Sequence, residues 1–269
     1  MHPDPIYTPE NTHPVHNLHF DWTGWFQGSP PPTSATDAAI DSCRENWLAD
    51  GIKPSTHRTD NGRIQILADT TPRVTPVFLA QRLKGRLQHA LRHNRAPVSF
   101  RRKVSVRSLG ANTSETVENY IRRQSDRSDY VDPRFKRHLG RFSLADADVH
   151  LQAAFRGVHG QYWYNLHLVI VIADRRWPVT RNENFGKLRN ACGAIARKKG
   201  CAISHLAVMP DHLHAAVRGP IDRSPEAIAL AFLNNLSYVM GYNRCWSAEY
   251  YVGTFSEYTL RALRGGRRS

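Results

Sequence analysis

An internal repeat constrains the fold of this 269-residue chain more than any other feature of its sequence. Strand-like and helix-like segments recur in the same order in the two halves, and one spacing relates equivalent positions. Three pairs of residues are each 149 positions apart: Arg63 and His212, Gln65 and His214, and Pro76 and Pro225. A repeated strand–helix–strand–strand–helix–strand order is typical of ferredoxin-like units. The sequence therefore predicts an α+β fold of two tandem ferredoxin-like (βαββαβ) halves that form an intramolecular pseudo-dimer.

The apolar pattern places the expected elements along the chain. In the first half we expect strands over 16–26, 63–68 and 99–106, and helices over 34–50, from Pro76 onward and after Asn112. In the second half we expect strands over 162–172, 202–208, 212–217 and 246–252, and helices over 182–199 and 225–242. Ser, Asp, Arg and Pro interrupt the pattern between the halves. The predicted domains are residues 1–124, a linker or wrapping segment over 125–160, and residues 161–269.

The net charge of the chain indicates which class of binding partner it favours. The chain has 37 Lys and Arg against 23 Asp and Glu, which gives a formal net charge of +14. Such an excess favours a polyanion, most often nucleic acid, although basic residues also serve solubility. The four cysteines have no metal or redox spacing, and no segment has the apolar run of a membrane span or signal peptide. We therefore expect a cytoplasmic protein that does not enter a membrane.

A short strand carries the first candidate site. Pro210 and Asp211 form a turn, and in the strand that follows, the His212 and His214 side chains share one face while Leu213 points to the core. Two imidazoles on one strand face can hold a metal ion. Two histidines on a solvated strand give the same pattern. Asp211 is a candidate general base, although its side chain is expected to face away from His212.

The stretch over 109–124 carries the second candidate site, on a helix that follows a strand break at Gly110. Asn112 is placed to cap it, and Glu115 completes a capping box. Tyr120 and Gln124 then lie one turn apart on the same side of the helix. The alternative interpretation is a tyrosine that packs on the core and a glutamine that caps the end of the helix.

Basic residues on two neighbouring elements are candidates for DNA binding. The helix that begins at Pro76 and the strand over 99–106 expose positive charge that suits a phosphate backbone. The candidates are Arg82, Lys84, Arg86, Arg101, Arg102 and Lys103. A solvated surface is the more usual interpretation of such charges on a helix.

Together these motifs carry a resemblance. The chain resembles the HUH single-tyrosine transposases of short bacterial insertion sequences and, more distantly, the REP-associated tyrosine transposases. The matching segments are His212-Leu213-His214, within Met-Pro-Asp-His-Leu-His, the segment Tyr120-Ile121-Arg122-Arg123-Gln124, and the Arg-Ser-Leu-Gly-Ala-Asn-Thr that precedes it. In that family a His-hydrophobic-His strand and a glutamine bind a divalent metal, and a tyrosine on a helix attacks single-stranded DNA. The resemblance covers both halves but not residues 125–160.

Each half departs from the family pattern, and the departures are complementary. The first half has the tyrosine helix but no histidine pair. The second half has the histidine pair, but its counterpart of the tyrosine helix is cut short within 255–269. Dimers of the family combine the histidines of one subunit with the tyrosine of the other. The resemblance therefore implies one composite site, made of Tyr120, Gln124, His212 and His214. Random decay would not spare one full set, which indicates that this site is used.

The resemblance also implies a chemistry. Two His nitrogens, one Gln oxygen and water suit Mg²⁺ or Mn²⁺. The implied activity is that of an HUH-type tyrosine DNA endonuclease or transposase: metal-dependent nicking and strand transfer on single-stranded or hairpin DNA, with Tyr120 forming a 5′-phosphotyrosine. The functional unit is expected to be a monomeric pseudo-dimer. Two alternatives stay open, a catalytically inactive DNA-hairpin-binding or regulatory protein derived from a transposase, and an RNA-binding ferredoxin-like module.

Overall fold

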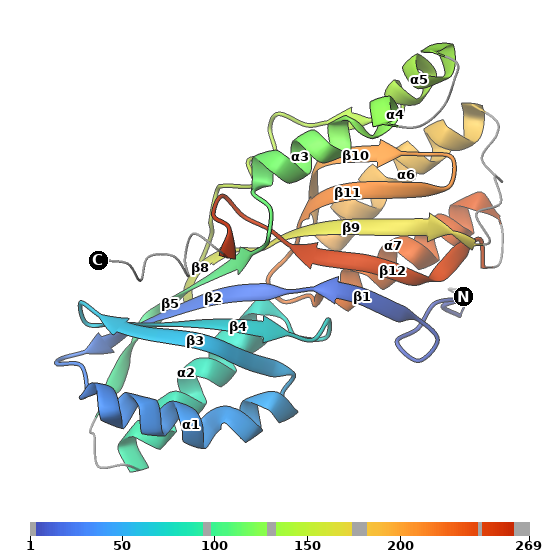
Figure 1. Ribbon diagram of the computed structural model, residues 1–269. Coiled ribbons are helices and arrows are strands. Elements are labelled where there is room, and N and C mark those ends of the chain that lie inside the picture. The colour runs from blue at the N-terminus through green and yellow to red at the C-terminus, as the bar shows by residue number, and fades with distance from the viewer. Residues whose placement is uncertain (1–3, 94–97, 128–132, 174–181, 242–243, 261–269) are drawn as a thin grey trace.

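Two six-stranded sheets with helices packed on them make up the protein (Figure 1). The computed structural model describes residues 4–93, 98–127, 133–173, 182–241 and 244–260. Among the helices within these ranges, none is both long enough and apolar enough to cross a lipid bilayer. The predicted mixed α+β architecture is confirmed.

The first sheet has the strand order β3-β4-β2-β5-β8-β7. Its strands are β2 (His19–Gln27), β3 (Ile52–Asp60), β4 (Arg63–Thr70), β5 (Ser99–Leu109), β7 (Phe155–Gly157) and β8 (Gly160–Trp163). The helices α1 (Thr33–Ala49) and α2 (Pro76–His93) cover one face. Because strand side chains alternate between faces, Phe20 and Trp22 of β2 reach the core under these helices, together with Leu83 and Leu87 of α2.

The second sheet has the order β1-β12-β9-β11-β10-β6. Its strands are β1 (His13–Asn17), β6 (Leu144–Ala145), β9 (Asn165–Ile172), β10 (Ala202–Val208), β11 (His212–Arg218) and β12 (Trp246–Thr254). The helices α6 (Asn182–Lys199) and α7 (Pro225–Met240) lie on one face, and α3 (Ser114–Arg122) lies on the other (Figure 1). Ser224 caps α7 by accepting from the Ala227 N–H, and Gly241 ends it in the left-handed region at φ 70°.

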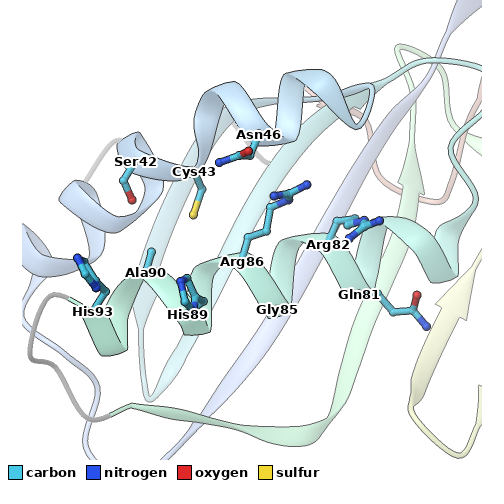
Figure 2. Close-up of a pocket in the computed structure, with 10 residues that line it drawn as sticks. All are labelled: Ser42, Cys43, Asn46, Gln81, Arg82, Gly85, Arg86, His89, Ala90 and His93. Atoms are coloured by element: carbon cyan, nitrogen blue, oxygen red, sulfur yellow. The ribbon is translucent and has the colours of Figure 1, made fainter.

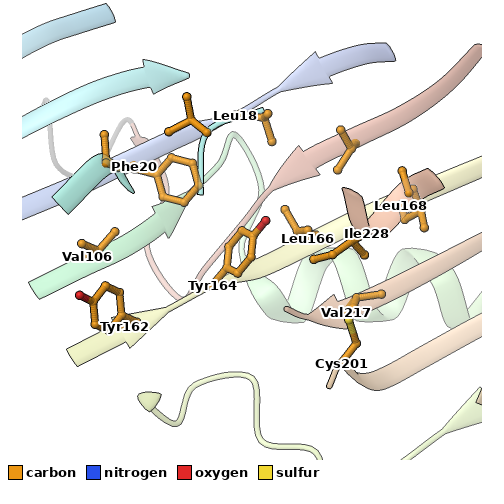
Figure 3. Packing of buried hydrophobic residues seen from close by; sticks show 14 of the residues in the cluster. Leu18, Phe20, Val106, Tyr162, Tyr164, Leu166, Leu168, Cys201, Val217 and Ile228 are labelled. Atoms are coloured by element: carbon orange, nitrogen blue, oxygen red, sulfur yellow. The ribbon is translucent and has the colours of Figure 1, made fainter. Parts of the chain in front are cut away.

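The two halves exchange their first strands. The chain runs from β1 in the second sheet through Leu18 into β2 in the first, and from β8 in the first sheet through Tyr164 into β9 in the second. β1 pairs in parallel with β12, and β8 pairs in parallel with β5. Leu18 and Phe20 meet Tyr164 and Leu166 at this junction (Figure 3), where the rings of Phe20 and Tyr164 are 6.1 Å apart. One continuous apolar core therefore runs through both halves.

The ends of β5 and β12 cross where the halves meet. Gly110 bridges to Thr259, and Thr113 bridges to Ser256. A Cβ at Gly110 would collide with the carbonyl oxygen of Thr254, so only glycine permits this approach of the two backbones. The chain leaves the crossing directly into α3. The residues expected to hold a truncated tyrosine helix lie largely beyond the described part, which ends at residue 260.

Most of the described segment between the halves packs on the second sheet, whereas its strand β7 joins the edge of the first sheet. It contains α4 (Gln124–Arg127), α5 (Pro133–Gly140) and the short strands β6 and β7. Leu139 of α5 is fully buried, and Phe142 stacks on Phe185 of α6 with ring centroids 5.2 Å apart. β6 pairs with β10 at the edge of the second sheet. In the described residues, α5 and β6 therefore wrap the outer end of the second half.

Candidate active site at the junction of the two halves

The helix α3 comes from the first half but docks on the sheet of the second. Val117 and Ile121 are buried against Ala207 of β10 and Ala216 of β11 in a small apolar cluster. The predicted cap is wrong by one residue, because Thr113 caps α3 by accepting from the Thr116 N–H at 3.2 Å. The hydroxyl is held in place because the Thr113 backbone bridges to the end of the other half.

Docking of α3 brings Tyr120 to the histidine strand. The Tyr120 ring meets the His214 ring edge-on, with centroids 5.4 Å apart and an interplanar angle of 82°. It also meets the His167 ring of β9 at 6.0 Å. The tyrosine of one half and the histidines of the other are therefore neighbours within one chain.

His212 and His214 lie together on the face of β11 that α3 covers. Their ring centroids are 4.8 Å apart, while Leu213 points into the opposite core. The expected orientation of Asp211 is wrong. Its carboxylate turns toward the strand and accepts a hydrogen bond from His212 Nδ1 at 2.6 Å, because Asp211 belongs to the turn and is not bound by strand alternation. A neutral imidazole that donates from Nδ1 carries its lone pair on Nε2.

Gln124 does not stand on the same helix as Tyr120. The Arg123 N–H bonds to the Asn119 carbonyl and closes α3, and Gln124 opens the separate short helix α4. The Gln124 side chain is buried, and its Nε2 donates to the Tyr120 carbonyl at 3.3 Å. This bond matches the alternative interpretation of Gln124 as a helix-end cap. Its Oε1 is the atom that a cation would bind.

His167 is a member of this cluster that the sequence interpretation missed. Its Nε2 lies 3.1 Å from His214 Nδ1, and the two rings stack with centroids 5.3 Å apart. Burial lowers the pKa of His167 to about 4. Burial, reinforced by His167 and His212, lowers the pKa of His214 to about 2. Both imidazoles are therefore neutral at pH 7. The sequence contained one signal for His167: it is a polar residue that alternates with the buried apolar residues of its strand.

A polar contact also fastens α3 to β10. Glu118 of α3 lies 3.4 Å from His205 Nδ1, and Arg122 lies 3.4 Å from His205 Nε2. Burial lowers the pKa of His205, which the neighbouring Glu118 partly offsets. The contact adds to the apolar docking of α3 and restrains the helix on which Tyr120 stands.

The side-chain types at the candidate site are ones that divalent cations accept as ligands. In the described ranges no three His, Cys, Asp or Glu side chains gather as a set of metal ligands. A cation held by His212 and His214 would therefore take its third protein ligand from another residue type, and the Gln124 amide oxygen is of the kind that Mg²⁺ and Mn²⁺ accept. Neutral imidazoles supply the nitrogen ligands without displacing a proton.

The basic DNA-binding candidates lie far from this cluster. Arg82 and Arg86 pair with Asp50 at 3.6 and 2.7 Å, and Lys84 donates to the carbonyls of Arg101 and Arg102. The two paired arginines line a groove of about 560 Å³ between α1 and α2 (Figure 2). Arg101, Arg102 and Lys103 are exposed on β5. At about 3.3 Å per residue, they are separated from the α3 end of β5 by roughly 20 to 25 Å.

The equivalent face of the first sheet holds different chemistry. Asp21 of β2 and Gln65 of β4 meet there, with Gln65 Nε2 donating to Asp21 Oδ2 at 2.7 Å. Burial raises the pKa of Asp21 to about 6. Arg63 and Gln65 stand where the second half has its histidines. In the described residues, the pairing of a tyrosine with two histidines occurs at one of the two faces.

Comparison with known proteins finds a similarity that is confined to the second half. The family model described as "Transposase IS200 like" matches residues 161–265, which include His212 and His214 but not Tyr120. A solved structure of a REP-associated tyrosine transposase bound to a REP hairpin is 15% identical, with a TM-score of 0.32. The alignment covers 38% of this chain and 61% of that one. A search of curated proteins found no match. Residues 161–265 of this chain are therefore similar to the IS200-like transposases, and this match covers less than half of the chain.

Proposed function

We propose that this protein is a metal-dependent enzyme that nicks and transfers single-stranded DNA through a 5′-phosphotyrosine at one composite site. The proposal assigns Tyr120 as nucleophile and His212, His214 and Gln124 as metal ligands. The observation that carries it is the contact between the Tyr120 ring of the first half and the His214 ring of the second, 5.4 Å apart. This contact joins the two parts of the family motif that the sequence separates.

We further propose that the halves are ferredoxin-like units that form an intramolecular pseudo-dimer. Numbered along each half, the four main strands follow the order 4-1-3-2 in both sheets. The Asn165 N–H donates to Ser108 Oγ at 3.1 Å, and the His19 N–H donates to Thr254 Oγ1 at 2.8 Å. Residues 19 and 165, like residues 108 and 254, are 146 positions apart. One contact is thus the counterpart of the other, as a two-fold axis requires.

The proposed domain boundaries follow from this symmetry. Residues 1–124 form the half with the tyrosine helix, and residues 161–269 form the half with the histidine pair. Residues 125–160 connect them, with β6 on the edge of the second sheet and β7 on the edge of the first. The exchanged strands β1 and β8 support reading the two halves as one functional unit, because each half completes the sheet of the other.

The chain's own residues suit the chemistry of transfer. Mg²⁺ or Mn²⁺ bound at the site would polarise the scissile phosphate and stabilise charge on the leaving 3′ oxygen. The Tyr120 phenol oxygen attacks the phosphorus and loses its proton to solvent, while the bond to the 3′ oxygen breaks and that oxygen takes up a proton. Attack by a 3′-OH on the phosphotyrosine reverses the step and joins strands. Asp211 orients His212 through its hydrogen bond.

Single-stranded or hairpin DNA is the proposed substrate. The net charge of +14 favours a polyanion. Arg101, Arg102 and Lys103 stay exposed along β5 and are the better placed phosphate contacts, since Arg82 and Arg86 already pair with Asp50.

A covalent-adduct assay tests the proposal. The protein is incubated with end-labelled single-stranded and hairpin oligonucleotides and Mn²⁺, and denaturing gels report DNA attached to protein. The wild-type chain should form an adduct that Tyr120→Phe and His214→Ala lose. Tyr238→Phe, at an exposed tyrosine of α7, is the matched control and should retain it. An adduct of wild-type yield in Tyr120→Phe would refute the assignment of the nucleophile.

One observation favours a second candidate, a catalytically inactive DNA-hairpin-binding protein derived from a transposase. The Gln124 amide is engaged with the Tyr120 carbonyl, as in a helix cap. Hairpin binding without an adduct at any metal concentration would favour this candidate.

A further inference from the structure

His167 makes a specific contact with the proposed metal-binding pair. It lies on β9, which pairs directly with the β11 strand of His214, and on the sheet face that α3 covers. Its Nε2 lies 3.1 Å from His214 Nδ1, which is hydrogen-bonding distance between two ring nitrogens. The Tyr120 and Tyr251 rings meet it edge-on at 6.0 and 5.7 Å, so its own ring is held from two sides.

The direction of this hydrogen bond decides what His214 can do. A neutral imidazole has one N–H, so one ring donates and the other accepts. If His214 donates from Nδ1, its Nε2 keeps a lone pair and can bind a cation. If His167 donates instead, His214 carries its hydrogen on Nε2 and cannot bind a cation through that atom.

The neighbouring histidine provides a comparison. The Asp211 carboxylate, 2.6 Å from His212 Nδ1, can accept when ionised, so His212 donates from Nδ1 and leaves Nε2 free. The same direction at His214 would give two Nε2 lone pairs in one cluster. The corresponding pair of the first half, Asp21 and Gln65, is also hydrogen-bonded but contains no imidazole. Both halves therefore have a side-chain hydrogen bond at these equivalent positions, and the two halves differ in which residue types form it.

We infer that His167 is a positioning residue: it accepts the Nδ1 hydrogen of His214 and thereby holds His214 Nε2 ready for the metal. The inference rests on the proposed metal site. His167 itself is not a ligand, because its Nε2 is occupied by His214. Partners of this kind orient metal-binding histidines, and their loss typically costs about 10- to 100-fold in metal affinity.

Isothermal titration calorimetry with Mn²⁺ measures the metal affinity of the protein and tests the inference without relying on activity. His167→Phe keeps a ring but lacks an acceptor, and should weaken Mn²⁺ binding by about 10- to 100-fold. His167→Gln places an amide oxygen near the former Nε2 and should restore most of the affinity. His89→Phe, the same change in the groove between α1 and α2, is the control and should leave the affinity unchanged.

The binding data distinguish failure of the proposed metal site from failure of the positioning role of His167. If the wild-type chain binds no Mn²⁺, or His214→Ala binds it equally well, the proposed metal site fails. If His214→Ala loses binding but His167→Phe keeps wild-type affinity, the positioning role of His167 is overturned. Equal loss in His214→Ala, His167→Phe and His167→Gln would make His167 a ligand and would also overturn it.

A measurement on the unmodified protein covers the case in which a variant fails to fold. Long-range ¹⁵N–¹H spectra of the metal-free chain distinguish the two imidazole tautomers. We expect His214 to carry its hydrogen on Nδ1. A hydrogen on Nε2 of His214 would contradict the inference.

Discussion

Replacing Asp21 with Asn should stabilise the protein above pH 6 and remove a pH dependence of stability that we expect in the wild-type chain. Asp21 lies on β2 and is largely buried. Gln65 donates to its Oδ2 at 2.7 Å, whereas its Oδ1 is buried without a partner in the described residues. Burial is the main cause that raises the pKa of this carboxyl to about 6, from 3.8.

The pKa difference between the folded and unfolded states determines the sign and the size of the change in unfolding free energy. Because the folded-state pKa is raised, the folded protein holds the Asp21 proton at a pH at which the unfolded chain has released it. The free energy of unfolding therefore falls as pH rises between about 4 and 6, and the loss is complete above the folded pKa. A separation of about two pH units, at about 1.36 kcal/mol each, corresponds to about 3 kcal/mol.

Urea unfolding between pH 4 and pH 8 measures this effect. The stability of Asp21→Asn relative to wild type should rise with pH and gain about 3 kcal/mol across the range. Asp41→Asn gives the baseline for removing an exposed carboxylate of α1, one that pairs with Arg44 at the surface at 2.9 Å. A difference between Asp21→Asn and wild type that stays constant with pH, or that shrinks as pH rises, would refute the reasoning.

Three further predictions concern the docking of α3, the crossing and DNA binding. Ile121→Ala should cost about 2 to 4 kcal/mol in urea unfolding, because Ile121 is 1% exposed in the cluster that holds α3 on β10 and β11; a cost below 1 kcal/mol would contradict this docking. Gly110→Ala should cost about 1 to 3 kcal/mol or more, because its Cβ would collide with the Thr254 carbonyl; unchanged thermal unfolding would contradict the close crossing. Arg102→Gln should lower the slope of log K against log salt for single-stranded DNA by about 0.7; an unchanged slope in fluorescence anisotropy would exclude a phosphate contact there.

The sequence predicted the elements that have a strong apolar period. The expected strand over 202–208 and helix over 182–199 match β10 and α6 within the described residues. β3 was not among the expected strands, because Ile52–Asp60 contains Pro54 and mostly polar residues and lacks alternation. The strand expected over 162–172 is divided at Tyr164 between β8 and β9. Local patterns cannot reveal that a strand changes sheets, since pairing partners come from distant parts of the chain.

At the candidate site the sequence could name residues but not their hydrogen bonds. The family pattern singled out Tyr120 and the histidine pair. The break between α3 and α4 was missed because the helical period continues through Gln124, while the closing bonds come from backbone geometry. Asp211 was misplaced because turn residues do not follow strand alternation. His167 escaped notice because its importance depends on a neighbouring strand.

The most direct test of the central claim, one composite site built from both halves of one chain, is a mixing experiment. Tyr120→Phe and His214→Ala chains are purified separately, combined, and assayed for covalent adducts beside the wild-type protein. If the site forms within one chain, the wild type forms an adduct and the mixture forms none. An adduct in the mixture would show that Tyr120 of one chain meets His214 of another, which would contradict the account.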